Sequence, residues 1–310
     1  MNRRHFTKIS TAAILGTSTI PFNVFASNEN PTLKLGGPLF EKYSSPEEWI
    51  AILKKLNYKA AYCPVDTNAA IETIKAYEAA ARSADIIIAE VGAWSNPISP
   101  DQSTAKAALE KCVNSLQLAE EIGAQCCVNI AGSNNRENWA GPHPDNFSDE
   151  TFELIVETTR KIIDEVKPKR TFYTLEAMPW IFPEDPDSYL RLIKAIDRKA
   201  FGVHLDPVNM MVSPAVFYKN ADLIRECFSK LGTHIKSCHA KDLVLKERTF
   251  MPQFDEVIPG RGMIDYSAFM TEIKKIPHVP VMMEHLDNAE EYLEGASYIR
   301  KVANSVGLQS

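Results

Sequence analysis

The chain has 310 residues, of which 45% are hydrophobic and 24% are charged, which suits one large domain or two small ones with an ample core. Its formal net charge of −6 implies no basic face and argues against nucleic acid as a partner. No apolar run reaches transmembrane length, so we expect no stable insertion into a membrane.

The first 26 residues carry the features of an export signal. Arg3 and Arg4 precede a mildly apolar segment, and residues 24–26 form an A-x-A-like end. We expect a twin-arginine signal peptide over residues 1–26, which the twin-arginine export machinery recognises, and a periplasmic mature chain over residues 27–310. Export in the folded state would allow a metal to be inserted before the chain crosses the membrane. The alternative is the basic terminus of a cytoplasmic protein.

Beyond this segment, apolar runs typical of strands alternate with helical patterns. Strands are predicted at residues 33–36, 59–63, 86–91, 126–130, 171–176, 201–206, 234–239 and 281–284. Helices are predicted at residues 46–56, 68–83, 101–122, 148–166, 187–196, 214–231 and 288–306, and one more begins at Asp265. Eight such β–α units predict an α/β protein, a single-domain (β/α)8 TIM barrel. The alternative is an open doubly wound sheet, but Gly36 and Gly37 match its phosphate-binding loop poorly.

Two long polar connections interrupt the alternation, at residues 132–147 and 240–262. Connections of this length inside a compact domain are usually functional or mobile. Ser45, followed by proline and two acids, and Asp265 have the positions and chemistry of helix caps.

The six cysteines form no CxxC motif. Cys126 and Cys127 are adjacent in a predicted strand and would point to opposite faces of the sheet. We expect buried free thiols rather than disulfides, even in an exported protein.

Four consecutive predicted strands end on a residue that can bind a metal ion. These residues are Glu176, Asp206, His239 and Glu284. In a barrel the ends of successive strands converge on one mouth, and three carboxylates with one imidazole need a positive charge between them. Oxygen-rich ligation with a single nitrogen suits Mn²⁺, Co²⁺ or Mg²⁺ and does not exclude Zn²⁺. Taken alone, each of these residues would be read as a surface or capping side chain.

Five motifs resemble those of a known group. They are Leu-Glu at 175–176, His-Leu-Asp-Pro-Val-Asn at 204–209, Cys-His-Ala-Lys-Asp at 238–242, Pro-Gly-Arg-Gly-Met-Ile-Asp at 259–265 and Met-Glu-His at 283–285. The mature chain resembles the sugar isomerase and epimerase superfamily with xylose-isomerase-like barrels, which includes ketose 3-epimerases, inosose dehydratases and endonuclease IV. The resemblance implies that Glu176, Asp206, His239 and Glu284 hold one divalent metal ion. It also implies that Glu176 and Glu284 serve as the acid/base pair.

The chemistry expected of such a site is sugar isomerisation or epimerisation. A metal ion that chelates two adjacent oxygens of a hydroxy-ketone stabilises an enediolate, and carboxylates on the two faces move the proton. Return of the proton to the opposite face gives an epimer, and return to the neighbouring carbon gives an isomer. The alternative is a lyase or hydrolase that acts on 3-keto-glycosides by the same enolate chemistry.

The sequence departs from the ketose 3-epimerases at two places. Those enzymes have a histidine three residues after the strand-six aspartate, and this chain has Asn209. Their arginine after the strand-seven histidine is matched only loosely by Arg248. We therefore expect a bulkier or differently oxidised carbohydrate, such as a glycoside or an oxidised sugar.

Five residues are candidates for contacts with the substrate. They are His204, Asn209, Lys241, His143 and Trp180. The alternatives are a histidine packed inside the barrel for His204, solvated loop side chains for Lys241 and His143, and a packed loop aromatic for Trp180. Glu90, at the end of the third predicted strand, is a further candidate, and Arg261 is expected on the surface of a turn.

Two alternative functions and the oligomeric state remain to be considered. A repair endonuclease would need a trinuclear zinc site, whereas the chain has only seven histidines and an acidic balance. A non-catalytic sugar-binding barrel would be expected to lose metal ligands, whereas all four are present. The sequence leaves open whether the chain forms a homo-oligomer.

Overall fold

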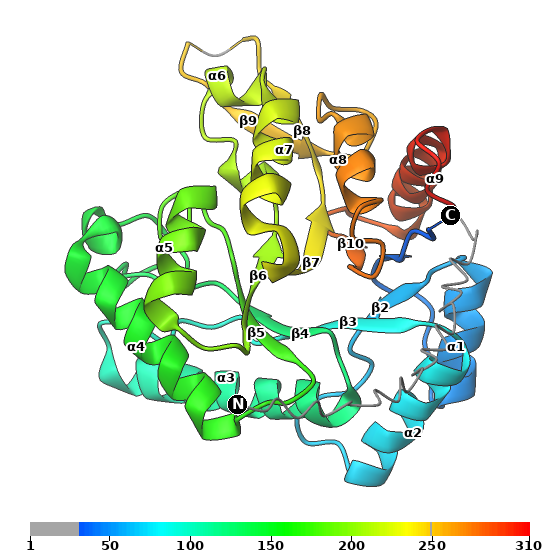
Figure 1. The fold of residues 1–310 in the computed structure, drawn as a ribbon, viewed down its shortest axis with the longest axis horizontal. Helices are drawn as coiled ribbons and strands as arrows, with labels where there is room; N and C mark the ends of the chain where they lie inside the picture. The colour runs from blue at the N-terminus through cyan, green and yellow to red at the C-terminus, as the bar shows by residue number, and fades with distance from the viewer. Residues whose placement is uncertain (1–30, 249) are drawn as a thin grey trace, which may run out of the picture.

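The computed structural model describes residues 31–248 and 250–310, so the predicted signal peptide lies outside the described residues. The main sheet has eight parallel strands in the order β1-β10-β7-β6-β5-β4-β3-β2 (Figure 1). They are β1 (Leu35–Gly36), β2 (Ala60–Tyr62), β3 (Ile87–Gly92), β4 (Cys126–Asn129), β5 (Phe172–Glu176), β6 (Phe201–Leu205), β7 (Ile235–Ala240) and β10 (Val281–Met283). With a helix between successive strands, this is the predicted (β/α)8 barrel, nearly closed.

The barrel approaches closure between its first two strands. The Lys59 N–H donates to the Leu35 carbonyl at 2.9 Å, although β1 and β2 form no regular ladder. Gly36 is required at this contact, because a Cβ there would lie 2.3 Å from the Ala60 oxygen. The absence of a side chain thus allows the two strand backbones to approach.

Helices cover the outside of the barrel. They are α1 (Pro46–Lys55), α2 (Ile71–Ser83), α3 (Gln102–Ile122), α4 (Asp149–Val166), α5 (Pro186–Ile196), α6 (Pro214–Phe217), α7 (Asn220–Leu231), α8 (Tyr266–Ile273) and α9 (Ala289–Ser305). The predicted caps are confirmed: Ser45 accepts the N–H of Glu48, and Asp265 accepts the N–H of Ala268.

The single helix predicted over residues 214–231 was wrong. The chain forms two helices, α6 and α7, with Tyr218 and Lys219 between them. Asn220 explains the break, because its buried side-chain amide donates to the Phe217 carbonyl at 2.8 Å and to the Met263 carbonyl at 3.0 Å. The Asn220 amide therefore supplies a hydrogen-bond donor to a carbonyl at the end of α6 that has no helical partner.

The second long connection is not a plain loop. It contains an antiparallel hairpin of β8 (Asp242–Leu245) and β9 (Phe254–Val257), which extends beside α6 at the top of Figure 1. The first long connection contains a short 3-10 helix, η1 (Pro144–Phe147).

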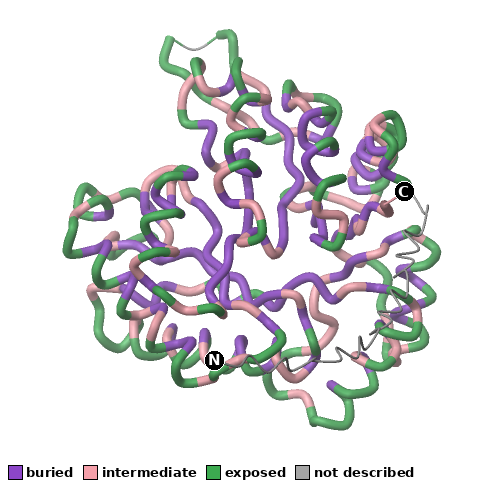
Figure 2. The backbone as a smooth tube through the Cα atoms, viewed as in Figure 1, coloured by how far each residue is buried: buried purple, intermediate pink, exposed green. Residues whose placement is uncertain are grey.

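The hydrophobic core lies between the sheet and the helices, and a small separate cluster of Ala60, Ala89 and Met282 lies inside the barrel. In Figure 2 the buried backbone runs through the strands and the inner sides of the helices. All six cysteines are free, and five of them are buried. None of the described helices is both long and apolar enough to cross a bilayer.

Candidate metal and active site

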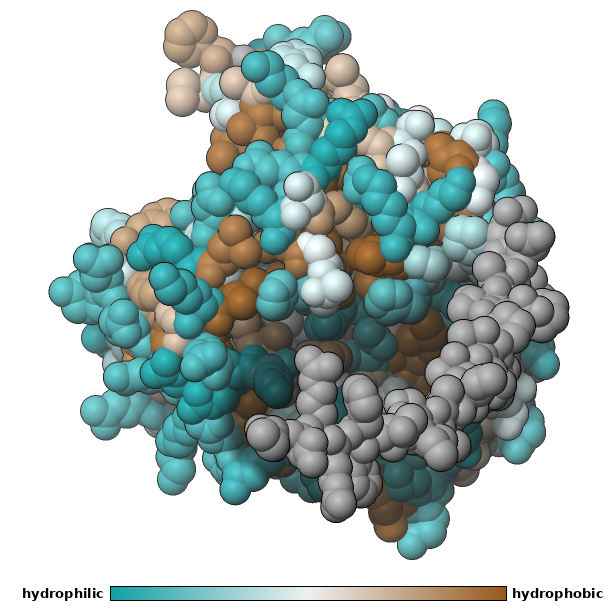
Figure 3. Space-filling model, in the orientation of Figure 1, coloured by the Kyte–Doolittle hydropathy of each residue, from teal (hydrophilic) through white to brown (hydrophobic). Residues whose placement is uncertain are grey.

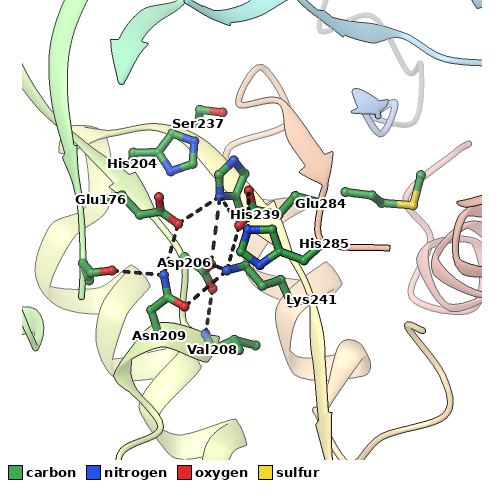
Figure 4. Close-up of polar contacts among 12 residues, drawn as sticks. Glu176, His204, Asp206, Val208, Asn209, Ser237, His239, Lys241, Glu284 and His285 are labelled. Atoms are coloured by element: carbon green, nitrogen blue, oxygen red, sulfur yellow. Dashed lines mark hydrogen bonds and ion pairs between the residues drawn. The ribbon is translucent and has the colours of Figure 1, made fainter. Parts of the chain in front are cut away.

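The four predicted metal ligands meet at the C-terminal ends of neighbouring strands. Glu176 ends β5, Asp206 and Glu284 directly follow β6 and β10, and His239 is the last but one residue of β7. Each offers one ligand atom, and these four atoms lie within 4.8 Å of one another. The side chains point toward a common centre in Figure 4.

The His239 imidazole lies at the middle of this group. Its Nδ1 is 3.0 Å from Glu176 Oε1, 2.9 Å from Glu284 Oε1 and 4.0 Å from Asp206 Oδ2. Asp206 and His239 are almost fully buried, while the Glu284 side chain retains 16% of its exposure. Bulk water therefore reaches the site from the side of Glu284.

Lys241 supplies a positive charge to the same group of carboxylates. Its Nζ lies 2.8 Å from Asp206 Oδ2 and 2.7 Å from Glu284 Oε1. Burial would lower the pKa of Lys241, but these two carboxylates outweigh it and raise the pKa above its usual value. Lys241 is therefore an ammonium ion throughout the pH range in which the protein is studied.

The two glutamates of the site differ in their proton affinity. Burial raises the pKa of Glu176 above its usual value, and His239 only partly offsets this effect. Burial acts in the same direction on Glu284, but His239 and Lys241 outweigh it and lower the pKa of Glu284. The pKa values of the two carboxyl groups are thus displaced in opposite directions, as those of an acid and base pair are.

The four ligands suit a divalent cation. Lys241 Nζ lies 2.8 Å from the buried Asp206 Oδ2, but it supplies a single positive charge to three carboxylates that lie close together. A divalent cation would balance the remaining negative charge. Three carboxylates and one imidazole are ligands that Mn²⁺, Mg²⁺ and Co²⁺ accept.

A second polar cluster lies on the other side of His239. His239 Nε2 is 3.3 Å from Glu90 Oε1, and His204 Nε2 is 2.7 Å from Glu90 Oε2. Burial would raise the pKa of Glu90, but the two imidazoles outweigh it and lower the pKa to about 2. Glu90, His204 and His239 also offer ligand atoms within 4.8 Å of one another.

Asn209 joins the acid side of the site to Lys241. Its Nδ2 donates to Glu176 Oε1 at 3.2 Å and to the Ala177 carbonyl at 3.1 Å, while its Oδ1 accepts from Lys241 Nζ at 3.2 Å. The amide thus fixes the position of one Glu176 oxygen and stabilises its ionised form.

A cavity of about 1050 Å³ opens above the ligands. The polar side chains that line it are Glu90, Glu176, Asn209, Lys241, Glu256, Glu284 and His285. The aromatic side chains that line it are Tyr62, Trp94, Trp139, Trp180, Phe254 and Tyr292. A cavity lined by both polar groups and aromatic rings suits a sugar, whose rings have apolar faces and polar edges.

The remaining sequence candidates lie in different places. Trp180 lines the cavity and donates from Nε1 to the Ala140 carbonyl at 2.6 Å, so it also holds the connection after β4. His204 is fully buried beneath the ligands and does not line the cavity. His143 caps η1 by accepting the Asp145 N–H, and it does not line the cavity either. Arg261 lies at the surface and pairs with Glu294.

Glu256 and His285 form a part of the site that the sequence did not predict. Glu256 Oε2 lies 2.8 Å from His285 Nδ1, and its Oε1 lies 3.6 Å from Lys241 Nζ. Glu256 lies on β9 of the hairpin, and His285 has a φ of 60°, uncommon for a residue other than glycine. The one local signal for this part of the site is His285 itself, which follows Glu284 in the Met-Glu-His motif at 283–285.

On the face seen in Figure 3, most of the described residues are hydrophilic, and hydrophobic ones form separate patches between them.

Comparisons with known proteins agree with the fold. The family model described as Xylose isomerase-like TIM barrel matches residues 36–302. No curated protein matches the sequence. A probable 3-DHS dehydratase from Bacillus anthracis is 14% identical, with a TM-score of 0.65 and coverage of 88% of this chain and 99% of the other.

Two further solved structures are similar in fold. The 3-keto-D-glucoside 4-epimerase from E. coli is 13% identical, with a TM-score of 0.63 and coverage of 87% of this chain and 100% of the other. A barrel from Mycobacterium smegmatis, solved in complex with magnesium, is 15% identical, with a TM-score of 0.60 and coverage of 85% and 90%. At these identities the likeness shows the fold alone.

Proposed function

The chain belongs to the family of xylose isomerase-like TIM barrels, and from this premise we propose that it is a divalent-metal-dependent isomerase or epimerase of a keto-sugar or sugar derivative. The observation that carries the proposal is the convergence of Glu176, Asp206, His239 and Glu284 at one end of the barrel, within 4.8 Å. Epimerases among the solved structures of the same fold support the reaction class.

The metal ion would be held by these four side chains. When bound, a divalent cation there would polarise two neighbouring substrate oxygens and stabilise the negative charge that builds up when the carbon between them loses its proton. The magnesium in the complex of the related barrel from Mycobacterium smegmatis supports a hard divalent ion.

The proton is moved by the two glutamates. In one direction of the reaction Glu284, whose pKa is held below its usual value by His239 and Lys241, accepts the proton from the substrate carbon. Glu176, whose pKa burial raises above its usual value, returns a proton to the substrate. Both carboxylates lie beside His239 Nδ1, at 3.0 Å for Glu176 and 2.9 Å for Glu284, so both are close to the proposed metal position (Figure 4). The reverse reaction exchanges their roles.

Lys241 and Asn209 prepare the site for the developing charge. Lys241 Nζ already contacts Asp206 and Glu284, and it also lines the cavity, so it can donate to a substrate oxygen. Asn209 holds Glu176 in place by donating to Oε1. Both side chains therefore act on orientation and charge, while the glutamates carry the proton.

The cavity favours a second candidate, a lyase of 3-keto-glycosides. A volume of about 1050 Å³ lies at the upper end of the usual range for small-molecule pockets and exceeds the needs of a single sugar ring. The same proton abstraction next to a ketone would expel a leaving group on the adjacent carbon, so the reacting glutamate would be the same. The substrate decides between the two outcomes.

The test follows hydrogen exchange and products in D₂O. Purified protein reconstituted with Mn²⁺ is incubated with keto-sugars and 3-keto-glycosides, and the products are identified by NMR and mass spectrometry. We expect deuterium at the reacting carbon, together with an epimer or isomer, or else a 2-hydroxyglycal from the lyase reaction. Glu284→Gln should lower kcat by about 10²–10⁴-fold.

The control for that test is Glu272→Gln, which removes a mostly buried carboxylate on α8 that pairs with Lys275. It should leave turnover unchanged. Full turnover in both Glu176→Gln and Glu284→Gln would overturn the proposal.

The cellular location is part of the proposal. Export by the twin-arginine machinery rests on the residues before position 27 and would place the enzyme in the periplasm. N-terminal sequencing of the protein from its native host should begin at Ser27, and an intact Met1 would contradict export.

A further inference from the structure

Four polar side chains meet inside the barrel beside the proposed metal site, and one of them, His239, is itself a proposed ligand. Glu90 comes from β3, His204 from β6, and Ser237 and His239 from β7. Their exposed fractions are 2%, 0%, 0% and 1%, and only Glu90 among them lines the cavity. Burying so many polar groups is costly unless each has a hydrogen-bond partner. The partners within the cluster therefore indicate its role.

The carboxylate of Glu90 is the common acceptor of this cluster. Its Oε2 lies 2.7 Å from His204 Nε2 and 3.2 Å from Ser237 Oγ, and its Oε1 lies 3.3 Å from His239 Nε2. An ionised carboxylate can only accept, so each of these neighbours donates to it.

The tautomer of His204 agrees with this reading. His204 Nδ1 is buried and has no hydrogen-bond partner among the residues that the structure describes. An imidazole nitrogen without a partner is tolerated more easily as a lone pair than as an N–H. The ring proton of His204 therefore lies on Nε2, where Glu90 accepts it.

The same logic applies to His239, whose two nitrogens face different groups. Nε2 faces Glu90 and Nδ1 faces the carboxylates of Glu176 and Glu284. A cation can take the Nδ1 lone pair when the remaining ring proton is on Nε2, which is where the Glu90 acceptor holds it. Carboxylates that accept from a metal-bound imidazole orient the ring and make the other nitrogen a better ligand.

We propose that Glu90 is a positioning residue: it fixes the Nε2–H tautomer and the ring orientation of His239 for the metal ion, while His204 and Ser237 hold the Glu90 carboxylate in place. The proposal rests on the proposed metal site. The ligand atoms of Glu90, His204 and His239 are also close enough together to hold a metal ion of their own. The proposal instead has these three side chains joined by hydrogen bonds, with no ion between them. A second metal ion per chain is therefore an outcome that contradicts it.

The first test measures Mn²⁺ affinity by titration calorimetry with a competing chelator. Glu90→Gln keeps the shape and removes the charge, and Glu90→Leu also removes the acceptor. We expect Kd to rise by about 10-fold in the first variant and nearer to 100-fold in the second. Glu272→Gln, the buried carboxylate on α8, should leave Kd unchanged.

A purely structural role for Glu90 would leave a different pattern. If Glu90 acts through the metal, saturating Mn²⁺ should restore much of kcat to Glu90→Gln, and the bound stoichiometry should be one in both proteins. An unchanged Kd in Glu90→Gln and Glu90→Leu, or a second ion per chain that Glu90→Gln removes, would overturn the positioning role.

The second test needs no variant, so it stands even if Glu90→Leu fails to fold. In protein with ¹⁵N-labelled histidine and bound Mg²⁺, two-bond ¹H–¹⁵N spectra should show His239 protonated on Nε2. A proton on Nδ1 would overturn the proposal while leaving a metal bound. If the wild-type protein binds no divalent ion, both the proposed function and this role of Glu90 are contradicted.

Discussion

Lys241 and Asp206 form an ion pair at the bottom of the cavity, with 2.8 Å between Nζ and Oδ2, although both side chains are almost completely buried. Such a pair is costly to form and still more costly to break, because one charge then remains without a partner. Removal of the Lys241 ammonium would leave the carboxylates of Asp206 and Glu284 without this partner.

The first prediction concerns Lys241→Met. In EDTA the free energy of unfolding should fall by about 3 kcal/mol, as for other buried pairs that lose one partner. With saturating Mn²⁺ the loss should be clearly smaller, because the ion would supply positive charge to the same carboxylates. Urea denaturation under both conditions measures this.

A matched control for this prediction is Lys275→Met, since the Lys275 side chain is exposed, whereas its partner Glu272 is mostly buried. It should cost no more than about 1 kcal/mol, with or without metal. An equal loss for Lys241→Met in EDTA and in Mn²⁺ would mean that the lysine and the ion do not share these carboxylates.

The second prediction concerns the pH dependence of turnover in Asn209→Leu. The Asn209 amide donates to Glu176 Oε1, which favours the ionised carboxylate and so lowers its pKa. Without this donor, the pKa of Glu176 should rise further above its usual value. The limb of the pH profile that reports Glu176 should therefore move to higher pH, whichever direction of the reaction is followed. A limb that stays in place, or moves to lower pH, would show that Glu176 does not titrate in turnover.

The third prediction concerns the hairpin that carries Glu256. Asp242 accepts four backbone N–H groups, those of Leu243, Gly260, Gly262 and Ile264. Asp242→Ala should lower the free energy of unfolding by about 3 kcal/mol, because these donors lose their acceptor. It should also raise KM about 10-fold, because Phe254 and Glu256 of the hairpin line the cavity.

The control for the hairpin is Asp255→Ala. It removes a partly exposed carboxylate of β9 that pairs with Lys246. Steady-state kinetics of the two variants should differ in KM by the full 10-fold. A normal KM in Asp242→Ala would exclude the hairpin from substrate binding.

The fourth prediction concerns the aromatic wall of the cavity. Trp139 lines the cavity and is 44% exposed, so its removal should not disturb the core. If its ring stacks on the sugar, Trp139→Ala should raise KM by about 5–10-fold and leave kcat within about twofold, since stacking contributes about 1 kcal/mol. Tyr218→Ala, which removes an exposed aromatic ring outside the cavity, should change neither constant.

The strand ends explain why the metal ligands were predictable from the sequence. Each of Glu176, Asp206, His239 and Glu284 lies at or next to the end of an apolar run, and parallel strands bring such ends together. The order of eight β–α units likewise predicted the barrel, because apolar periodicity and helix caps are local signals.

Other parts of the site depend on contacts that no local pattern carries. Glu90 lies inside β3 rather than at its end, and it meets His204 and Ser237, which follow it by 114 and 147 residues. Only the curvature of the barrel brings these three together. The break before α7 depends on the Asn220 amide reaching Met263, which is a tertiary contact of the same kind.

The central claim is that four side chains hold one divalent ion, and anomalous diffraction from crystals soaked with Mn²⁺ tests it most directly. The account predicts one strong manganese peak per chain, bound by Glu176, Asp206, His239 and Glu284. No peak among these four residues at saturating Mn²⁺, or a peak held by other side chains, would contradict it.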